Sequence, residues 1–165
     1  MPPGWDTGKS PTCTASRAQS PTTGFYRAMK ANGMQSRAEY LEEADYQDPH
    51  KCYQAVKKLL KLKNRPTCIF VPDDLAAFGG LDAIRDAGLR VGEDVSLAGY
   101  DGHRLMQLMR PRLTTIRQDT MAIGEKAAVA LIESIEEPMT AGVQTIVVKG
   151  ELLHGDTMRA ARQAE

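Results

Sequence analysis

Hydrophobic side chains recur at helical spacing in two stretches of the first sixty residues. Phe25, Ala28 and Met29 share one helix face, and Gly33 stands where that helix would end. Asp48 is a candidate N-cap for a second helix, with Pro49 at the first helical position. The positions that follow form the apolar stripe of a half-buried helix: Cys52, Ala55, Val56, Leu59 and Leu60.

Further along, short apolar runs alternate with longer helical patterns. Residues 68–71 are a continuous apolar run, which indicates a buried parallel strand, and residues 95–99 are predicted to form the next strand. Between them, a helix is expected to begin near Asp73 and Asp74 and to end at Gly88. The pattern then predicts a short helix at 103–109, an extended segment at 111–116, a long helix from 119 or 120 to Pro138, and strand pieces at 145–148 and 152–153.

Strands that alternate with helices in this way predict an α/β fold, a parallel sheet with helices on both faces. Residues 1–22 stand apart from this order. Pro, Gly, Ser and Thr fill 15 of the first 24 positions, and the apolar residues there are isolated. Such a segment buries too little surface to offset the entropy of ordering it, so we expect an irregular arm.

The charge balance argues against direct binding of nucleic acid. Lys and Arg together number 21, as do Asp and Glu, and no block of the sequence is basic. The lysines between residues 57 and 63 lie mostly off the apolar stripe and indicate a solvated helix face, with an anion-binding site as the less favoured alternative. No run of 18 apolar residues and no signal-peptide pattern occurs. Three widely spaced cysteines favour a reducing compartment, so we expect a cytoplasmic protein that binds no membrane.

No short motif indicates catalysis, a metal or a cofactor. The sequence Gly8-Lys9-Ser10 lacks the preceding glycine of a phosphate-binding loop, since Pro3 stands at that position. The three histidines lie far apart, and none has a companion at ligand spacing. Although distant residues could still converge in the fold, we predict no enzyme, no metal site and no cofactor.

Acidic residues stand directly after two of the predicted strands. In parallel α/β sheets, ligands bind beyond the carboxyl ends of the strands, where a carboxylate can accept hydrogen bonds from two hydroxyls of a sugar or pair with an amine. Two carboxylates there would bind a polyhydroxylated or cationic ligand better than an anionic one. Asp74 is favoured as a helix N-cap, and Asp73 is balanced between a turn former and a ligand contact. Asp101 precedes a glycine and, on the residues alone, is favoured as a turn residue.

Three segments, in this order, carry a specific resemblance: residues 65–80 (RPTCIFVPDDLAAFGG), 87–101 (AGLRVGEDVSLAGYD) and 111–118 (PRLTTIRQ). Together they resemble the lac/galactose repressor family of bacterial transcription regulators, over about residues 24–157. The resemblance implies one lobe of a periplasmic-binding-protein-like core. Residues 23–117 would form the C-terminal lobe, 118–150 a returning helix and strand of the N-terminal lobe, and 151–165 a closing strand and tail.

The resemblance also implies four ligand-binding residues. Asp101 matches the aspartate that binds effector hydroxyls, and Asp73 matches a pocket position that is often asparagine in the family. Gln118 lies where the chain crosses between the lobes, and Tyr46 falls near an aromatic residue that covers the apolar face of the effector. The family usually has an arginine at the position of Pro21. Either the sequence has diverged there, or residues 1–22 are not the natural start.

The function implied by the resemblance is the effector-binding and dimerisation portion of a transcription regulator that responds to a small, sugar-like ligand. A homodimer would form through Leu75, Phe78, Leu105 and Met109, on a helix with apolar residues on two sides and on the segment before Pro111. DNA would be bound only through a headpiece, which we expect this chain to lack, along with the first part of the N-terminal lobe. The alternatives are a solute-binding protein of a sugar transporter and, less favoured, an α/β enzyme.

Overall fold

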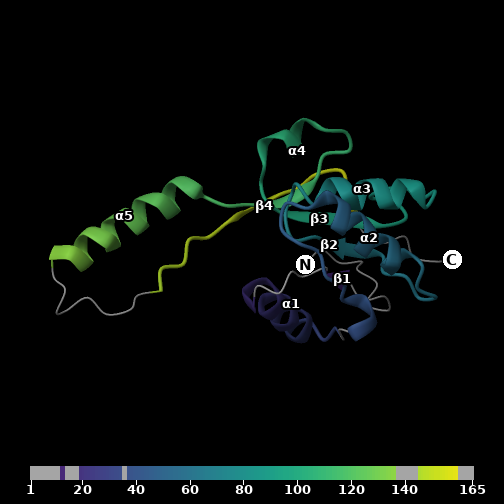
Figure 1. The fold of residues 1–165 in the computed structure, drawn as a ribbon, viewed down its shortest axis with the longest axis horizontal. Coiled ribbons are helices and arrows are strands. Elements are labelled where there is room, and N and C mark those ends of the chain that lie inside the picture. The colour runs from purple at the N-terminus through teal and green to yellow at the C-terminus, as the bar shows by residue number, and fades with distance from the viewer. Residues whose placement is uncertain (1–11, 14–18, 35–36, 137–144, 160–165) are drawn as a thin grey trace.

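The computed structural model describes residues 12–13, 19–34, 37–136 and 145–159, which form a five-stranded sheet with surrounding helices (Figure 1). The strands lie in the order β1-β2-β3-β4-β5; the first four are parallel, and β5 is antiparallel to β4. The strands are β1 (Thr12–Cys13), β2 (Cys68–Phe70), β3 (Ser96–Asp101), β4 (Thr114–Arg117) and β5 (Glu151–Leu153). The helices are α1 (Gln19–Ala31), the 3-10 turn Ala38–Tyr40, α2 (Pro49–Leu60), α3 (Ala77–Asp86), α4 (Arg104–Leu108) and α5 (Thr120–Glu136).

The parallel-dominated sheet with its surrounding helices confirms the α/β prediction. In Figure 1 α3 lies above the strands and α1 lies below them, and α2 packs against α3. The predicted stripe of α2 faces the core, where Cys52, Val56 and Leu59 are fully buried. Ile69 of β2 and Leu97 of β3 are fully buried in the same cluster. Burial of these apolar side chains is the main favourable contribution to folding.

Three helix boundaries lie where local signals in the sequence predicted them: the start of α2 and the ends of α1 and α3. Asp48 Oδ1 accepts a hydrogen bond of 2.9 Å from Lys51 N at the start of α2, and Pro49 occupies the first helical position. Gly33 and Gly88 follow the ends of α1 and α3 with positive φ.

Two differences from the predicted elements lie at the edges of the sheet. Thr12–Cys13 form a strand beside β2, and α1 begins at Gln19, inside the stretch expected to be irregular. Pairing with β2 provides Thr12 and Cys13 with backbone hydrogen-bond partners, which the local composition cannot predict. Conversely, 145–148 were expected to form a strand, and the structure has no regular element there. Among the described residues, only 151–153 of this segment pair with β4.

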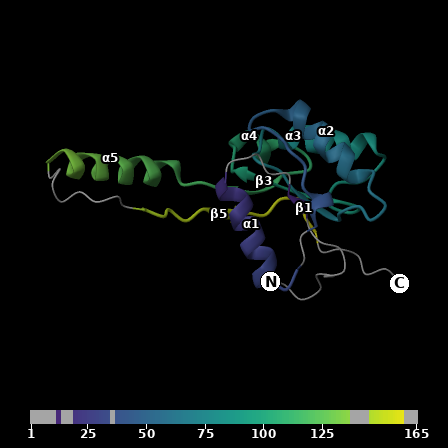
Figure 2. The same ribbon diagram turned by 60° about the horizontal axis from the view of Figure 1, so that its bottom comes forward.

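Helix α5 extends away from the sheet, and the chain returns toward β5 along the segment from residue 145 (Figures 1 and 2). None of its side chains is buried, although the helix carries a broad apolar face. Its exposed large apolar residues are Met121, Ile123, Val129, Leu131, Ile132 and Ile135. No helix in the described part of the chain is long and apolar enough to cross a membrane.

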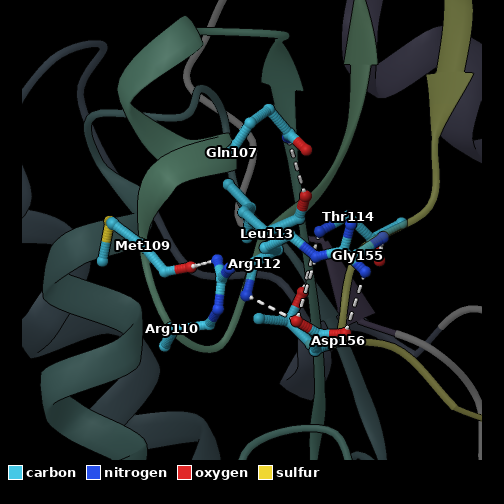
Figure 3. Close-up of polar contacts among 9 residues, drawn as sticks. Gln107, Met109, Arg110, Arg112, Leu113, Thr114, Gly155 and Asp156 are labelled. Atoms are coloured by element: carbon cyan, nitrogen blue, oxygen red, sulfur yellow. Dashed lines mark hydrogen bonds and ion pairs between the residues drawn. The ribbon is translucent and has the colours of Figure 1, made fainter.

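The segment after β5 is fastened to the start of β4 by a dense set of polar contacts (Figure 3). The Arg112 guanidinium donates from Nε to Asp156 Oδ2 at 3.2 Å and from Nη2 to Oδ1 at 3.3 Å. This pairing lowers the pKa of Asp156. The buried Thr157 hydroxyl accepts from Thr114 N at 2.9 Å and donates to Leu97 O at 2.7 Å. These bonds tie the C-terminal segment to β3 and β4.

Candidate functional site

The four predicted ligand-binding residues gather at the carboxyl ends of the central parallel strands. Asp101 is the last residue of β3, and Gln118 follows the last residue of β4. Asp73 comes three residues after the end of β2, and Tyr46 lies in the loop before α2. Since the carboxyl ends of parallel strands meet at one edge of the sheet, residues far apart in the sequence come together there.

Asp101 is half-buried and bonded to Gln118. The Gln118 side chain donates from Nε2 to Asp101 Oδ1 at 2.6 Å, and Gln118 N donates to the Asp101 carbonyl at 3.3 Å. From the residues that the structure describes, Asp101 Oδ2 accepts no hydrogen bond. Burial raises the pKa of Asp101, and the bond from Gln118 acts in the opposite direction.

The backbone of Asp101 is strained, and its carboxylate is partly shielded from water. Its φ angle is 106°, a region that residues other than glycine rarely adopt. Such conformations persist only where the surroundings hold them, and they cluster at functional sites. Asp101 was favoured as a turn residue on the residues alone; the structure makes it the last residue of β3, with this unusual φ and a half-buried carboxylate at the sheet edge.

Tyr46 presents a partly open aromatic ring near these acidic groups. The residue is 43% exposed. Burial of the remainder raises the pKa of Tyr46, and the negative charges of Asp101 and Asp73 raise it further. The phenol thus lies within electrostatic reach of both carboxylates, as expected of an aromatic wall beside a hydroxyl-binding acid.

Asp73 lies at the same edge, but its carboxylate is turned into the protein. The residue is 1% exposed. Its Oδ2 accepts from Gln47 N at 2.7 Å, and its Oδ1 accepts from Ala76 N at 2.8 Å. Because both oxygens are bonded to backbone amides and the residue is buried, the geometry argues against a direct ligand contact for Asp73.

The prediction that Asp74 caps the following helix is wrong. α3 begins at Ala77, and it is Asp73 whose side chain bonds to the amide of Ala76, just before the helix. Asp74 is 1% exposed and accepts from Thr115 Oγ1 at 2.6 Å and from His103 N at 2.5 Å. Reasoning from sequence missed this role, although the hydroxyl of Thr115 was a signal that β4 could supply a donor.

A hollow of about 340 Å³ lies next to Gln118, where the chain passes from β4 into α5 and returns before β5. Its lining includes Arg117, Lys149 and Glu151. Arg117 is ion-paired with Glu151 across β4 and β5. Among the described residues, no group of three or more His, Cys, Asp or Glu side chains is arranged to hold a metal ion.

The four residues expected at a dimer interface divide into two pairs. Leu75 is 46% exposed and Leu105 is 59% exposed. Phe78 and Met109 are partly buried and pack against the core cluster. The interface prediction therefore rests on the two exposed leucines, with Phe78 and Met109 packed beneath the surface.

A family model described as the periplasmic binding protein-like domain matches residues 9–158 of the chain. The HTH-type transcriptional repressor PurR of Yersinia pestis (strain Pestoides F) is 35% identical over 130 residues. That match covers 76% of this chain and 38% of the repressor, so the chain spans about two fifths of the length of this relative.

Two solved structures are similar over nearly the whole chain. A LacI transcriptional regulator from Bacillus cereus subsp. cytotoxis NVH 391-98 is 25% identical with a TM-score of 0.84, over 93% of this chain and 56% of that one. A lac repressor dimer bound to operator and the anti-inducer ONPF is 27% identical with a TM-score of 0.79, over 92% of this chain and 46% of that one.

Proposed function

The chain belongs to the lac/galactose repressor family, within the periplasmic binding protein-like domains, and we propose that it is the effector-binding and dimerisation portion of a cytoplasmic transcription regulator. Membership in this family supports the regulatory role, because the relatives described above are transcriptional regulators. In this proposal DNA is bound by a headpiece outside the present sequence. Effector binding shifts the population between two lobe arrangements and thereby alters DNA binding.

The effector is a small, neutral, polyhydroxylated molecule. The observation that carries this assignment is the half-buried Asp101 carboxylate, in which Oδ1 is held by Gln118 and Oδ2 is bonded to no described residue. A sugar hydroxyl donates to that oxygen, and the ring of Tyr46 covers a C–H face of the same ligand. Asp73 adds negative potential without contact, so an anionic ligand binds less well than a neutral one.

Thermal shift and calorimetry with a panel of neutral mono- and disaccharides, together with their phosphate esters, test this assignment. In Asp101→Asn the amide oxygen still accepts from Gln118. The amide NH2 group, which can only donate, replaces the carboxylate oxygen that accepts from a ligand hydroxyl. Affinity for the neutral ligand should fall about tenfold or more, since a buried hydrogen bond to a charged group is lost. Asp82→Asn, on the exposed side of α3, is the matched control and should bind as the wild type does.

The pH dependence of the same binding provides a second check. The pKa of Asp101 is raised, so its carboxylate takes up a proton at a higher pH than an exposed aspartate. Affinity should therefore weaken as the pH falls through this raised pKa, and Asp101→Asn should abolish the pH dependence. Tighter binding of the phosphate esters, or unchanged affinity in Asp101→Asn, would refute the assignment.

The dimer forms through the surface that carries Leu75 and Leu105, backed by Phe78 and Met109. Leu75 and Leu105 directly precede the buried residues Ala76 and Met106 in the chain, and pairing two copies would bury their exposed apolar area. Light scattering should give twice the chain mass for the wild type, and Leu105→Glu should give the monomer mass. Val129→Glu, on α5, is the matched control and should remain a dimer. A monomer with Val129→Glu and a dimer with Leu105→Glu would place the interface elsewhere.

A further inference from the structure

Two consecutive buried carboxylates, Asp73 and Asp74, join β2 to α3 and face two different loops. Each residue is 1% exposed. Burying a carboxylate is costly unless hydrogen-bond donors surround it. In this structure the donors that the two side chains meet come from outside the β2–α3 junction as well as from within it.

Asp73 holds the loop that carries Tyr46. Its Oδ2 accepts from Gln47 N at 2.7 Å, and Gln47 has a φ of 56°, in the left-handed region. Its Oδ1 accepts from Ala76 N at 2.8 Å, so the same carboxylate is anchored at the start of α3. A residue in the left-handed region costs free energy, and the bond to Asp73 offsets part of that cost.

Asp74 brackets Asp101 on both sides. The carbonyl before Asp101 accepts from Asp74 N at 2.8 Å, and the His103 amide donates to Asp74 Oδ2 at 2.5 Å. The Thr115 hydroxyl donates to Asp74 Oδ1 at 2.6 Å. Asp101, with its φ of 106°, therefore lies between two backbone groups that are both bonded to one buried residue.

We propose that Asp73 and Asp74 are a pair of positioning residues, each of which fixes one strained loop and neither of which contacts the ligand. Asp73 sets the place of Tyr46 and Asp74 sets the place of Asp101, so the rigid β2–α3 junction determines how the two side chains face one another. The proposal rests on the proposed function, in which Tyr46 and Asp101 bind the ligand. It assigns a role to both members of a pair in which only Asp73 was expected at the pocket.

The chemistry of the donors makes the two residues differ in what can replace them. Both partners of Asp73 are backbone amides, which can only donate. In Asp73→Asn the side-chain oxygen accepts from one of them, while the side-chain NH2 group faces the other donor and makes no hydrogen bond. One partner of Asp74 is the Thr115 hydroxyl, which can rotate and accept instead. Thr115 Oγ1 also accepts from Gly102 N at 3.3 Å, and its second lone pair can accept from an asparagine amide. Asp74→Asn therefore keeps its oxygen toward His103 and its amide toward Thr115, whereas Asp74→Ala loses both contacts.

Amide hydrogen exchange by NMR on the full 165-residue chain tests the positioning role without any ligand. Asp73→Ala should speed exchange of the Gln47 amide about tenfold and leave His103 unchanged. Asp74→Ala should speed exchange of the His103 amide and leave the Gln47 amide unchanged. Asp74→Asn should keep exchange at His103 slow. Asp82→Ala is the control for removing an exposed carboxylate and should alter neither amide.

If an alanine variant does not fold, the asparagine pair still decides the question. Asp73→Asn should speed exchange at Gln47 or Ala76, while Asp74→Asn should leave His103 slow. Equal exchange at these amides in both asparagine variants would overturn the proposal. Faster amide exchange at both loops in each variant would also overturn it, because that pattern indicates a general loss of stability.

A ligand arm separates failure of the positioning role from failure of the proposed function. With the neutral saccharide that binds best in the panel, Asp74→Asn should bind within about twofold of the wild type and Asp73→Asn about tenfold more weakly. If the wild type binds no neutral saccharide, the proposed function fails while the exchange pattern still decides the positioning role. Slow loop exchange together with lost affinity in Asp74→Asn would show direct ligand contact and overturn this inference.

Discussion

Replacing Gly102 with alanine should damage the turn beside Asp101 far more than the same change at another glycine with the same backbone. Gly102 has a φ of 73°, and an added Cβ would lie 2.5 Å from Arg117 Cβ and 2.7 Å from its Cγ. Gly88 has a φ of 72°, and nothing lies within 4 Å of an added Cβ. The two substitutions share the backbone penalty, so their difference isolates the collision with β4.

The left-handed backbone costs an alanine about 1 kcal/mol, which is the whole effect expected for Gly88→Ala. Overpacking against β4 adds about 1–3 kcal/mol, so Gly102→Ala should lose about 2–4 kcal/mol. In thermal unfolding these values correspond to falls of about 3 °C and about 6–12 °C for a chain of this size.

Urea unfolding followed by circular dichroism measures the two free energies of unfolding. The affinity for the neutral saccharide should also fall in Gly102→Ala and stay unchanged in Gly88→Ala, because only the first change displaces the turn that carries Asp101. Equal destabilisation by the two substitutions would refute the close packing of this turn on β4.

Three further predictions concern the frame around the site. Gly79→Ala should lower the free energy of unfolding by about 1–3 kcal/mol, because the new Cβ would collide with the Pro49 carbonyl where α2 and α3 touch. Gly124→Ala in the exposed α5 is the control, and in urea unfolding it should raise the free energy of unfolding by up to about 1 kcal/mol. Thr157→Val should cost about 2–4 kcal/mol because two buried backbone groups lose their partner, and Thr157→Ser should cost clearly less. Cys52 is fully buried and burial raises its pKa to about 12, so mass spectrometry should find it alkylated by iodoacetamide only after unfolding; rapid labelling of the native protein would contradict its burial.

Much of the fold could be predicted because the decisive signals are local. The Asp48 cap, the apolar stripe of α2 and the glycine that ends α3 each act within one or two turns of helix. The gathering of Asp101 and Gln118 was also predictable in outline, since parallel strands bring their carboxyl ends to one edge.

The remaining features depend on partners that are distant in the sequence. Whether Asp73 or Asp74 bonds to the start of α3 is decided by Gln47 and Thr115, which are 26 and 41 residues away. The short strand at 12–13 exists because β2 lies beside it, which no local pattern reveals. Composition alone described that stretch as irregular.

The most direct test of the account is a map of where a ligand binds. The isotope-labelled chain would be titrated with neutral saccharides while backbone and side-chain amide shifts are followed by NMR. The account predicts saturable shifts confined to the amides of residues 46–47 and 101–103 and to the side-chain amide of Gln118. Shifts centred on the hollow between α2 and α3 at Tyr53 and Asp86, or no saturable shift with any saccharide, would contradict it.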